Sequence, residues 1–220
     1  MRADEMTVAE LATMRPASVP VLYRHGIEFC AGASRRLGDA CREAAVEVAA
    51  LLAEVEREEA SGAGAVAIAW SRQPLANLVD HIVGAFHTVE QREMNQLHDL
   101  LTDLGARRPG AAEQHDLAGA VADLRSELME HMAKEEAVLF PWLRSGRGAL
   151  ARTPIQVMMM EHEATLRLLN RVRALRQAFA AAAAPAAEIV DRLSELDRHV
   201  REHMHLENNI LFPRALRGEE

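Results

Sequence analysis

Apolar residues recur every three or four positions in four long stretches of the chain after Pro74. This spacing places the apolar side chains on one face of a helix, so it predicts four amphipathic helices. Each helix would have about 30 residues and a length of ~45 Å, and the short connections favour antiparallel neighbours. The pattern therefore predicts an all-α fold with an antiparallel four-helix bundle, whose helices cover about 75–104, 111–143, 154–184 and 186–216.

The chain before Pro74 has shorter helical patterns. Thr7 and Glu10 have the spacing of a capping box, which marks the start of a short helix. Further helices are expected over about 18–25 and over 37–58, the latter interrupted near Arg42. A break rich in Gly and Ser follows. We therefore expect a small helical N-terminal domain over residues 1–58, a linker over 59–73 and the bundle over 74–220.

The composition narrows the classes of function. Of the 220 residues, 49% are hydrophobic and 26% are charged, which is typical of a folded globular protein. The net charge of −8 argues against nucleic-acid and anionic-membrane partners, because both require a basic surface. The first residues lack the apolar core of a signal peptide, and no apolar run has the ~18 residues of a membrane span. We expect a cytoplasmic protein whose two cysteines, Cys30 and Cys41, are reduced thiols.

One twelve-residue segment occurs twice in the chain. Residues 130–141 read EHMAKEEAVLFP and residues 202–213 read EHMHLENNILFP, with an offset of 72 residues. In each copy a histidine is followed four residues later by a glutamate. Four residues make about one helical turn, so both side chains project from one face and reach the same point in the bundle core. The two pairs are His131 with Glu135 and His203 with Glu207.

The helix before each copy contains one further histidine that fits the same centre, His87 in one case and His162 in the other. The chain is thus a duplicated helix pair that supplies four imidazoles and two carboxylates. If both glutamates bridge, each of two metal ions receives two nitrogens and two oxygens, and a bridging oxo or hydroxo group leaves an open position on each ion. This His-rich set indicates two iron ions in a hemerythrin-type arrangement. The expected ligands are His87, His131, Glu135, His162, His203 and Glu207.

A structural explanation competes with metal binding for each piece taken alone. A single helix histidine is usually a surface or hydrogen-bonded core residue, and a His-x-x-x-Glu pair is commonly a solvated contact. The repetition favours metal, because burying six such groups without a cation would cost several kcal/mol per charged group.

Other polar residues are candidates for roles beside the centre. Glu127 and His199 each lie four residues before a histidine of the repeat, so each can orient an imidazole or line a solvent path. Glu161 directly precedes the lone histidine of its helix and lies either beside the site or on the flank of the bundle. His205 belongs to no such pattern, and we expect it to be solvated.

The paired HMxxE…LFP segments and the LENNILFPRAL segment near the end resemble the iron–sulfur cluster repair di-iron proteins of the ScdA/YtfE or RIC family. The segment TVAELATMRPASVPVLYRHGIEFCAGASRRLGDAC resembles the small cysteine-containing domain that precedes the hemerythrin-like bundle in that family. The resemblance implies that the six residues above bind two irons. It also implies a role in repairing clusters damaged by nitric oxide or oxidative stress, with damaged or apo iron–sulfur proteins as partners.

The cysteine motif departs from the family. The family typically has two adjacent cysteines followed by two glycines, whereas this chain reads Cys30-Ala31-Gly32-Ala33. We expect Cys30 to be partly exposed in a loop near a helix N-terminus, with thiolate character suited to handling iron, nitric oxide or a partner's thiol. A single thiolate holds metal weakly, so its chemistry would be transient or would pair two thiols across a homodimer. In the alternative interpretation both cysteines are small buried hydrophobic residues.

The sequence leaves three functions open. The leading hypothesis is a di-iron protein that repairs iron–sulfur clusters by donating iron. The second is a hemerythrin-like protein that binds or senses NO or O2, which needs the same metal site but no N-terminal thiol. The third is an enzyme that reduces NO or nitrite at the diferrous centre, so whether the chain is an enzyme stays undecided.

Overall fold

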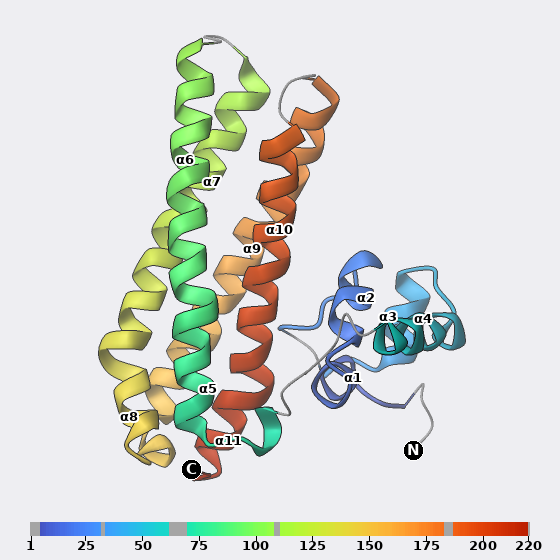
Figure 1. Ribbon diagram of the computed structural model, residues 1–220, viewed down its shortest axis with the longest axis vertical. Coiled ribbons are helices and arrows are strands. Elements are labelled where there is room, and N and C mark those ends of the chain that lie inside the picture. The colour runs from blue at the N-terminus through green and yellow to red at the C-terminus, as the bar shows by residue number, and fades with distance from the viewer. Residues whose placement is uncertain (1–4, 32–33, 62–69, 108–110, 183–186, 220) are drawn as a thin grey trace.

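The computed structural model describes residues 5–31, 34–61, 70–107, 111–182 and 187–219. Four long helices run side by side as a bundle, and a group of short N-terminal helices lies against α10 on one flank (Figure 1). The predictions of an all-α fold and of a helical bundle are confirmed.

The bundle helices follow the predicted order, and three of them contain a π-helical turn. The first helix extends past its expected end to Arg107. In chain order the segments are α5 (Leu75–His81), the π-turn η2 (Ile82–His87), α6 (Thr88–Arg107), α7 (Ala112–Lys134), the π-turn η3 (Glu135–Leu139), α8 (Phe140–Arg144), α9 (Arg152–Ala182), α10 (Ala187–Leu206), the π-turn η5 (Glu207–Leu211) and α11 (Phe212–Leu216). Short 3-10 turns occur at η1 (Trp70–Arg72) and η4 (Gly148–Leu150).

The π-turns η3 and η5 begin at the glutamates of the two repeat copies, Glu135 and Glu207. A proline follows six residues later in each copy, Pro141 and Pro213. Proline has no backbone N–H to donate and its ring crowds the carbonyl four residues earlier, so a regular α-turn is disfavoured just before it. The wider π-turn accommodates the proline, and such turns are frequent at functional sites.

The N-terminal segment (residues 5–61) contains α1 (Val8–Met14), α2 (Ser18–Arg24), α3 (Leu37–Glu43) and α4 (Val48–Ala60). The predicted capping box is confirmed, since Thr7 Oγ1 accepts from the Glu10 N–H and the Glu10 carboxylate accepts from the Thr7 N–H. The predicted interruption of the 37–58 helix is also present, with Ala45 at φ 54° between α3 and α4. Helix α4 runs to Ala60, and residues 62–69 of the expected linker lie outside the described residues.

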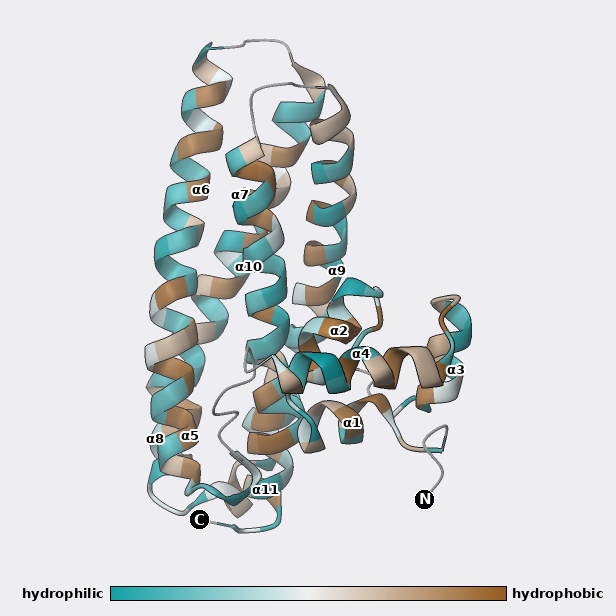
Figure 2. Cartoon of the chain, turned by 45° about the vertical axis from the view of Figure 1, so that its right-hand side comes forward, coloured by the Kyte–Doolittle hydropathy of each residue, from teal (hydrophilic) through white to brown (hydrophobic). Residues whose placement is uncertain are grey.

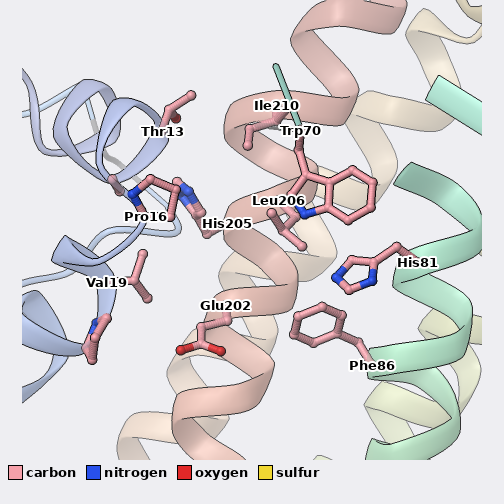
Figure 3. A pocket seen from close by; sticks show the side chains of 12 residues that line it. Thr13, Pro16, Val19, Trp70, His81, Phe86, Glu202, His205, Leu206 and Ile210 are labelled. Atoms are coloured by element: carbon pink, nitrogen blue, oxygen red, sulfur yellow. The ribbon is translucent and has the colours of Figure 1, made fainter. Parts of the chain in front are cut away.

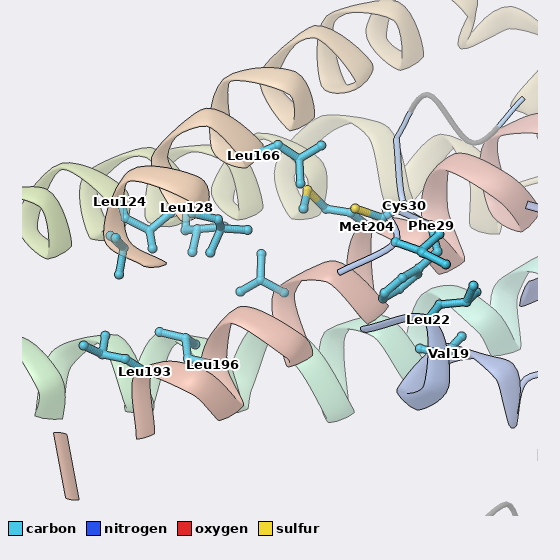
Figure 4. Packing of buried hydrophobic residues seen from close by; sticks show 14 of the residues in the cluster. Val19, Leu22, Phe29, Cys30, Leu124, Leu128, Leu166, Leu193, Leu196 and Met204 are labelled. Carbon is cyan, nitrogen blue, oxygen red and sulfur yellow. The ribbon is translucent and has the colours of Figure 1, made fainter. Parts of the chain in front are cut away.

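The N-terminal segment shares its apolar core with the bundle. Apolar and polar residues alternate along the bundle helices, as the brown and teal bands of Figure 2 show. Figure 4 shows Phe29 and Cys30 of the N-terminal segment beside Met204 of α10, and all three are buried. A separate cluster that includes Phe140 and Phe212 fills the end of the bundle near the C-terminus.

None of the helices in the described ranges has the length and apolar character needed to span a membrane.

Candidate metal centre

The structure brings all six residues of the expected ligand set together inside the bundle. Each side chain is at most 2% exposed. The ligand atoms form two overlapping groups, and within each group they lie within 4.8 Å of one another. The first position lies between His87 and His203, and the second lies between His131 and His162. Both groups contain Glu135 and Glu207.

The imidazole nitrogens have the separation that a shared ion requires. Nε2 of His87 lies 3.1 Å from Nε2 of His203, and Nε2 of His131 lies 3.0 Å from Nε2 of His162. Two nitrogens that bind one ion at about 2.1 Å and at right angles are about 3.0 Å apart. The spacing within each histidine pair therefore fits two ligands of one metal ion.

The two carboxylates border both positions. An oxygen of Glu135 lies 3.4 Å from Nε2 of His87 and from Nε2 of His131. Oxygens of Glu207 lie 3.2 Å from Nε2 of His162 and of His203. Both oxygens of each glutamate are buried without a hydrogen-bond partner among the described residues. Since an ionised group is costly to bury unless it is paired or binds a metal, the residues present fit a metal site.

Each of the four imidazoles has a hydrogen-bond acceptor behind it. A histidine that binds metal commonly donates its other ring N–H to such a group, which fixes its tautomer and orientation. In every case here Nδ1 faces the acceptor, and the lone pair of Nε2 is left for the centre. The pairs are His87 with Glu136 at 2.8 Å, His131 with Glu161 at 3.0 Å, His162 with Asn208 at 2.8 Å and His203 with Glu90 at 3.1 Å.

The carboxylates also govern protonation at the centre. Burial lowers the pKa of His131, but the negative charges of Glu135, Glu207 and Glu161 outweigh burial and raise that pKa to about 9. A proton therefore competes with a metal ion for Nε2 of His131. Burial raises the pKa of Glu90, whereas its imidazole partner His203 and the nearby His199 lower it to about 2. Glu90 is accordingly an ionised acceptor at neutral pH.

The three residues expected beside the centre differ in their contacts with it. Glu161 lies at the site, where it accepts from His131 Nδ1 and pairs with Lys134 Nζ at 2.8 Å. His199 acts indirectly, because its Nδ1 lies 3.1 Å from Glu90, the acceptor for a ligand imidazole. Glu127 is half-buried on α7 and has no hydrogen bond or ion pair within the described part of the chain. The imidazole four residues after Glu127 is oriented by Glu161 instead.

Sequence reasoning missed three of the four acceptors, namely Glu90, Glu136 and Asn208. The repeat contained a signal for two of them, because Glu136 and Asn208 occupy the same position in the two copies, directly after the glutamates of the centre. Glu90 follows His87 by three residues but bonds to a histidine of another helix. Only the packing of α6 against α10 reveals that contact.

Cys30 differs from its expected placement. The side chain is fully buried, and its thiol donates to Oε1 of Glu28 at 2.8 Å. Burial, with the negative charge of Glu28, raises the pKa of the Cys30 thiol well above its ordinary value. The other oxygen of Glu28 pairs with Arg201 of α10. The prediction of an exposed thiol with thiolate character is therefore wrong, because the loop packs against the bundle. Cys41 is buried as well.

The second repeat copy binds the Cys30 loop, whose described part is residues 25–31. Asn208 Nδ2 donates to the Cys30 carbonyl at 3.0 Å, and Asn209 Nδ2 donates to the Phe29 carbonyl at 2.9 Å. Nδ1 of His205 lies 3.3 Å from the same Phe29 carbonyl. His205 is 4% exposed and burial lowers its pKa to about 4, so the prediction of a solvated side chain is wrong.

A cavity of about 270 Å³ lies between the N-terminal segment and the bundle (Figure 3). The residues that line it include Val19, Trp70, Phe86 and Glu202. The Phe86 ring also stacks against the His203 ring, with a centroid distance of 5.6 Å. The cavity therefore comes within one aromatic ring of the centre.

Known proteins resemble the whole chain. Residues 81–215 match the model of the hemerythrin HHE cation binding domain, and residues 4–59 match ScdA_N, a domain of unknown function. The chain is 31% identical over 223 residues to the iron-sulfur cluster repair protein YtfE of Pectobacterium carotovorum subsp. carotovorum (strain PC1), with all of both chains covered. It is also 31% identical over 218 residues, or 97% of each chain, to the protein of that name from Yersinia pestis (strain Pestoides F). With its buried His/Glu centre in the matched bundle, the chain belongs to the YtfE family of hemerythrin-domain proteins.

Proposed function

We propose that this protein repairs iron–sulfur clusters damaged by nitric oxide or oxidative stress, by donating iron from a di-iron centre. The observation that carries the proposal is the buried set of four imidazoles and two carboxylates, whose carboxylate oxygens have no hydrogen-bond partner in the described residues. The names of the relatives, iron-sulfur cluster repair proteins, support the repair role.

In this proposal the six side chains would hold two iron ions, and Glu135 and Glu207, which border both positions, would be shared between them. Imidazole and carboxylate groups suit iron, and two bound irons would supply the iron that is transferred. The protein's own part is positioning, because each Nδ1 is fixed by an acceptor and the surrounding helices exclude water. Protons compete with iron for the imidazole nitrogens, so the occupancy of such a site depends on pH.

The thiol of Cys30 acts at a later stage in the proposal. Its burial keeps it protonated while the Cys30 loop is docked, so reaction with iron or with a partner's thiol requires the loop to open. The damaged or apo iron–sulfur protein is the partner expected to meet the opened loop. Two unpaired cysteines suit the reducing environment of the cytoplasm, where we place this function.

The test begins with anaerobic purification and metal analysis. We expect about two irons per chain and the near-ultraviolet absorption of an oxo-bridged ferric pair, whereas zinc alone would contradict the iron assignment. Acidification should release the metal, because neutral imidazole and ionised carboxylate are the binding forms. Iron content that stays constant down to about pH 4 would require a different ligand set.

The functional test is incubation of the loaded protein with an apo or nitric-oxide-damaged iron–sulfur protein. Recovery of cluster absorption and activity is expected with the wild type. Cys30→Ser should retain the iron spectrum and lower the recovery. Full recovery with that variant would remove the thiol from the proposed mechanism.

Binding of NO or O2, or reduction of NO or nitrite, is the second candidate function. The cavity lined by Phe86 favours it, because that ring also stacks against the His203 ring, and a mainly apolar space one ring away from the centre suits a small uncharged gas. If gas binding is the function, NO should change the spectrum of the reduced protein while the apo iron–sulfur protein stays inactive. Nitrite consumption with an added electron donor would identify the enzyme alternative.

A further inference from the structure

Each metal position is bordered by two histidines and by the same two glutamates, but the hydrogen-bond acceptors behind the histidines differ between the positions. At the first position both acceptors are carboxylates, Glu136 behind His87 and Glu90 behind His203. Glu90 contacts the imidazole of His199 as well as that of His203, but neither carboxylate has an arginine or lysine partner within the described part of the chain. Glu90 is completely buried, so water screens its charge little.

At the second position the acceptors carry less negative charge. The acceptor behind His162 is the neutral amide of Asn208. The acceptor behind His131 is Glu161, whose charge is offset by Lys134 at 2.8 Å. The two positions therefore share the same bridging carboxylates but differ in the charge of their surroundings.

The sequence repeat shows where this difference arises. Asn208 stands in the second copy where Glu136 stands in the first, at the offset of the repeat. Thr165 follows His162 by three residues, as Glu90 follows His87, so a hydroxyl replaces a carboxylate at that place too. Both differences leave the first position with the more negative surroundings.

The chemistry of metal-bound imidazole gives the consequence. A carboxylate acceptor makes imidazole a stronger donor than an amide does, and such outer contacts change metal affinity by about 10–100-fold. A nearby negative charge also attracts the cation directly. We propose that the second position, between His131 and His162, holds its ion less tightly and releases it first, and that Asn208 is the positioning residue that sets this difference. If the proposed iron donation holds, on which this last step rests, the second position supplies the iron.

The Cys30 loop fixes the orientation of the Asn208 amide. Nδ2 of Asn208 donates to the Cys30 carbonyl, so Oδ1 is the atom that faces Nδ1 of His162. Asn209 provides a matched comparison, because it donates to the same loop at Phe29 but has no contact with a histidine of the centre. The two asparagines separate the effect on His162 from the effect on loop docking.

The test measures release of ferrous iron from the full-length protein, loaded anaerobically, into an excess of a chelator that colours on binding iron. The wild type should show two phases of about equal amplitude. Asn208→Asp should slow the fast phase by about tenfold or more, because His162 gains a carboxylate acceptor. Glu90→Gln should speed the slow phase by a similar factor, because His203 loses one.

Asn209→Asp is the control, since it removes a donor to the loop and should leave both phases unchanged. The proposal is overturned if the wild type releases both ions in one phase, or if Asn208→Asp leaves the fast phase unaltered. It is also overturned if Asn209→Asp slows that phase as much as Asn208→Asp does. Should Asn208→Asp fail to fold, as judged by circular dichroism, an unaltered slow phase in Glu90→Gln overturns it equally.

The release assay contains no iron–sulfur protein, so its outcome is independent of the repair function. Two distinct phases with the expected responses, alongside no recovery of an apo iron–sulfur protein, would reject the proposed function and retain the inequality of the positions. Recovery of the cluster protein with a single release phase would reject the inequality and retain the function.

Discussion

The two copies of the repeat share the residues of the metal centre and differ on the face beside it. Seven of the twelve positions are identical, including the histidine, the glutamate and the proline. In the first copy, the side chains of Ala133, Glu136 and Ala137 are exposed to solvent. Their counterparts His205, Asn208 and Asn209 hydrogen-bond to the Cys30 loop. The remaining two differences, Leu206 and Ile210, line the cavity beside the N-terminal segment.

Two separate requirements therefore act on the same helical segment. The inward face must present a histidine and a glutamate at one-turn spacing, and this requirement is met identically in both copies. The outward face depends on its neighbour, which is solvent for the first copy and the N-terminal segment for the second. The differences between the copies therefore mark the docking surface of the N-terminal segment.

Removing a carboxylate that borders both positions should weaken metal binding at both. Glu135→Ala or Glu207→Ala is expected to lose most of both irons, because each carboxylate borders both positions. His87→Ala or His162→Ala should lose mainly one iron, since each imidazole borders one position. Metal analysis of the four purified variants checks this difference. Equal iron retention in all four would rule out the bridging roles.

Removing the N-terminal segment should affect the second copy more than the first. A chain that begins at Arg72 contains every expected ligand, so we expect it to fold and keep its irons. It should melt about 5 °C or more below the full chain, because His205, Met204 and the cavity wall become exposed. Calorimetry and iron analysis report the two outcomes. Loss of iron or aggregation would mean that this segment completes the core of the centre.

Making the second copy resemble the first should release the Cys30 loop. His205→Ala combined with Asn209→Ala introduces the alanines that the first copy has at 133 and 137. Removing two hydrogen bonds of about 1 kcal/mol each should raise the open population about thirtyfold. The rate of reaction of Cys30 with a thiol reagent measures that population, and Cys30→Ser gives the background from Cys41. An unchanged rate would show that apolar packing alone holds the loop.

The pH dependence of the thiol should give the smallest effect. Because the folded pKa of Cys30 is raised, the stability gained from its neutral form is full below the ordinary thiol pKa of about 8.5 and is lost as pH rises toward the folded pKa. Alkylation of the wild type should therefore need a higher pH than alkylation of a free thiol. Glu28→Gln should shift the pH profile of alkylation to lower pH, because it removes the negative charge next to the Cys30 thiol. Identical profiles for both proteins would exclude Glu28 as a cause.

The four bundle helices, the capping box of the first helix and the residues that meet at the centre were all predictable from the order of residues along the chain. These features depend on periodicity and on spacing within a helix, which are local properties that a repeat makes visible. His131 and Glu135 share a face because they are one turn apart, whatever surrounds them. The duplication then indicated that two such faces meet.

The groups that lie behind and beside those residues depend on how distant parts of the chain pack together. Glu90 of α6 contacts His203 of the neighbouring helix α10. Cys30 is buried because its loop packs against α10 and η5, which lie more than 170 positions later in the chain. The spacing of residues along one helix contains no information about such contacts. Protonation followed the same rule, since burial and Glu28 raise the pKa of Cys30 where the sequence predicted a thiolate. A side chain's charge state depends on the groups packed around it, and these are set only when distant segments come together.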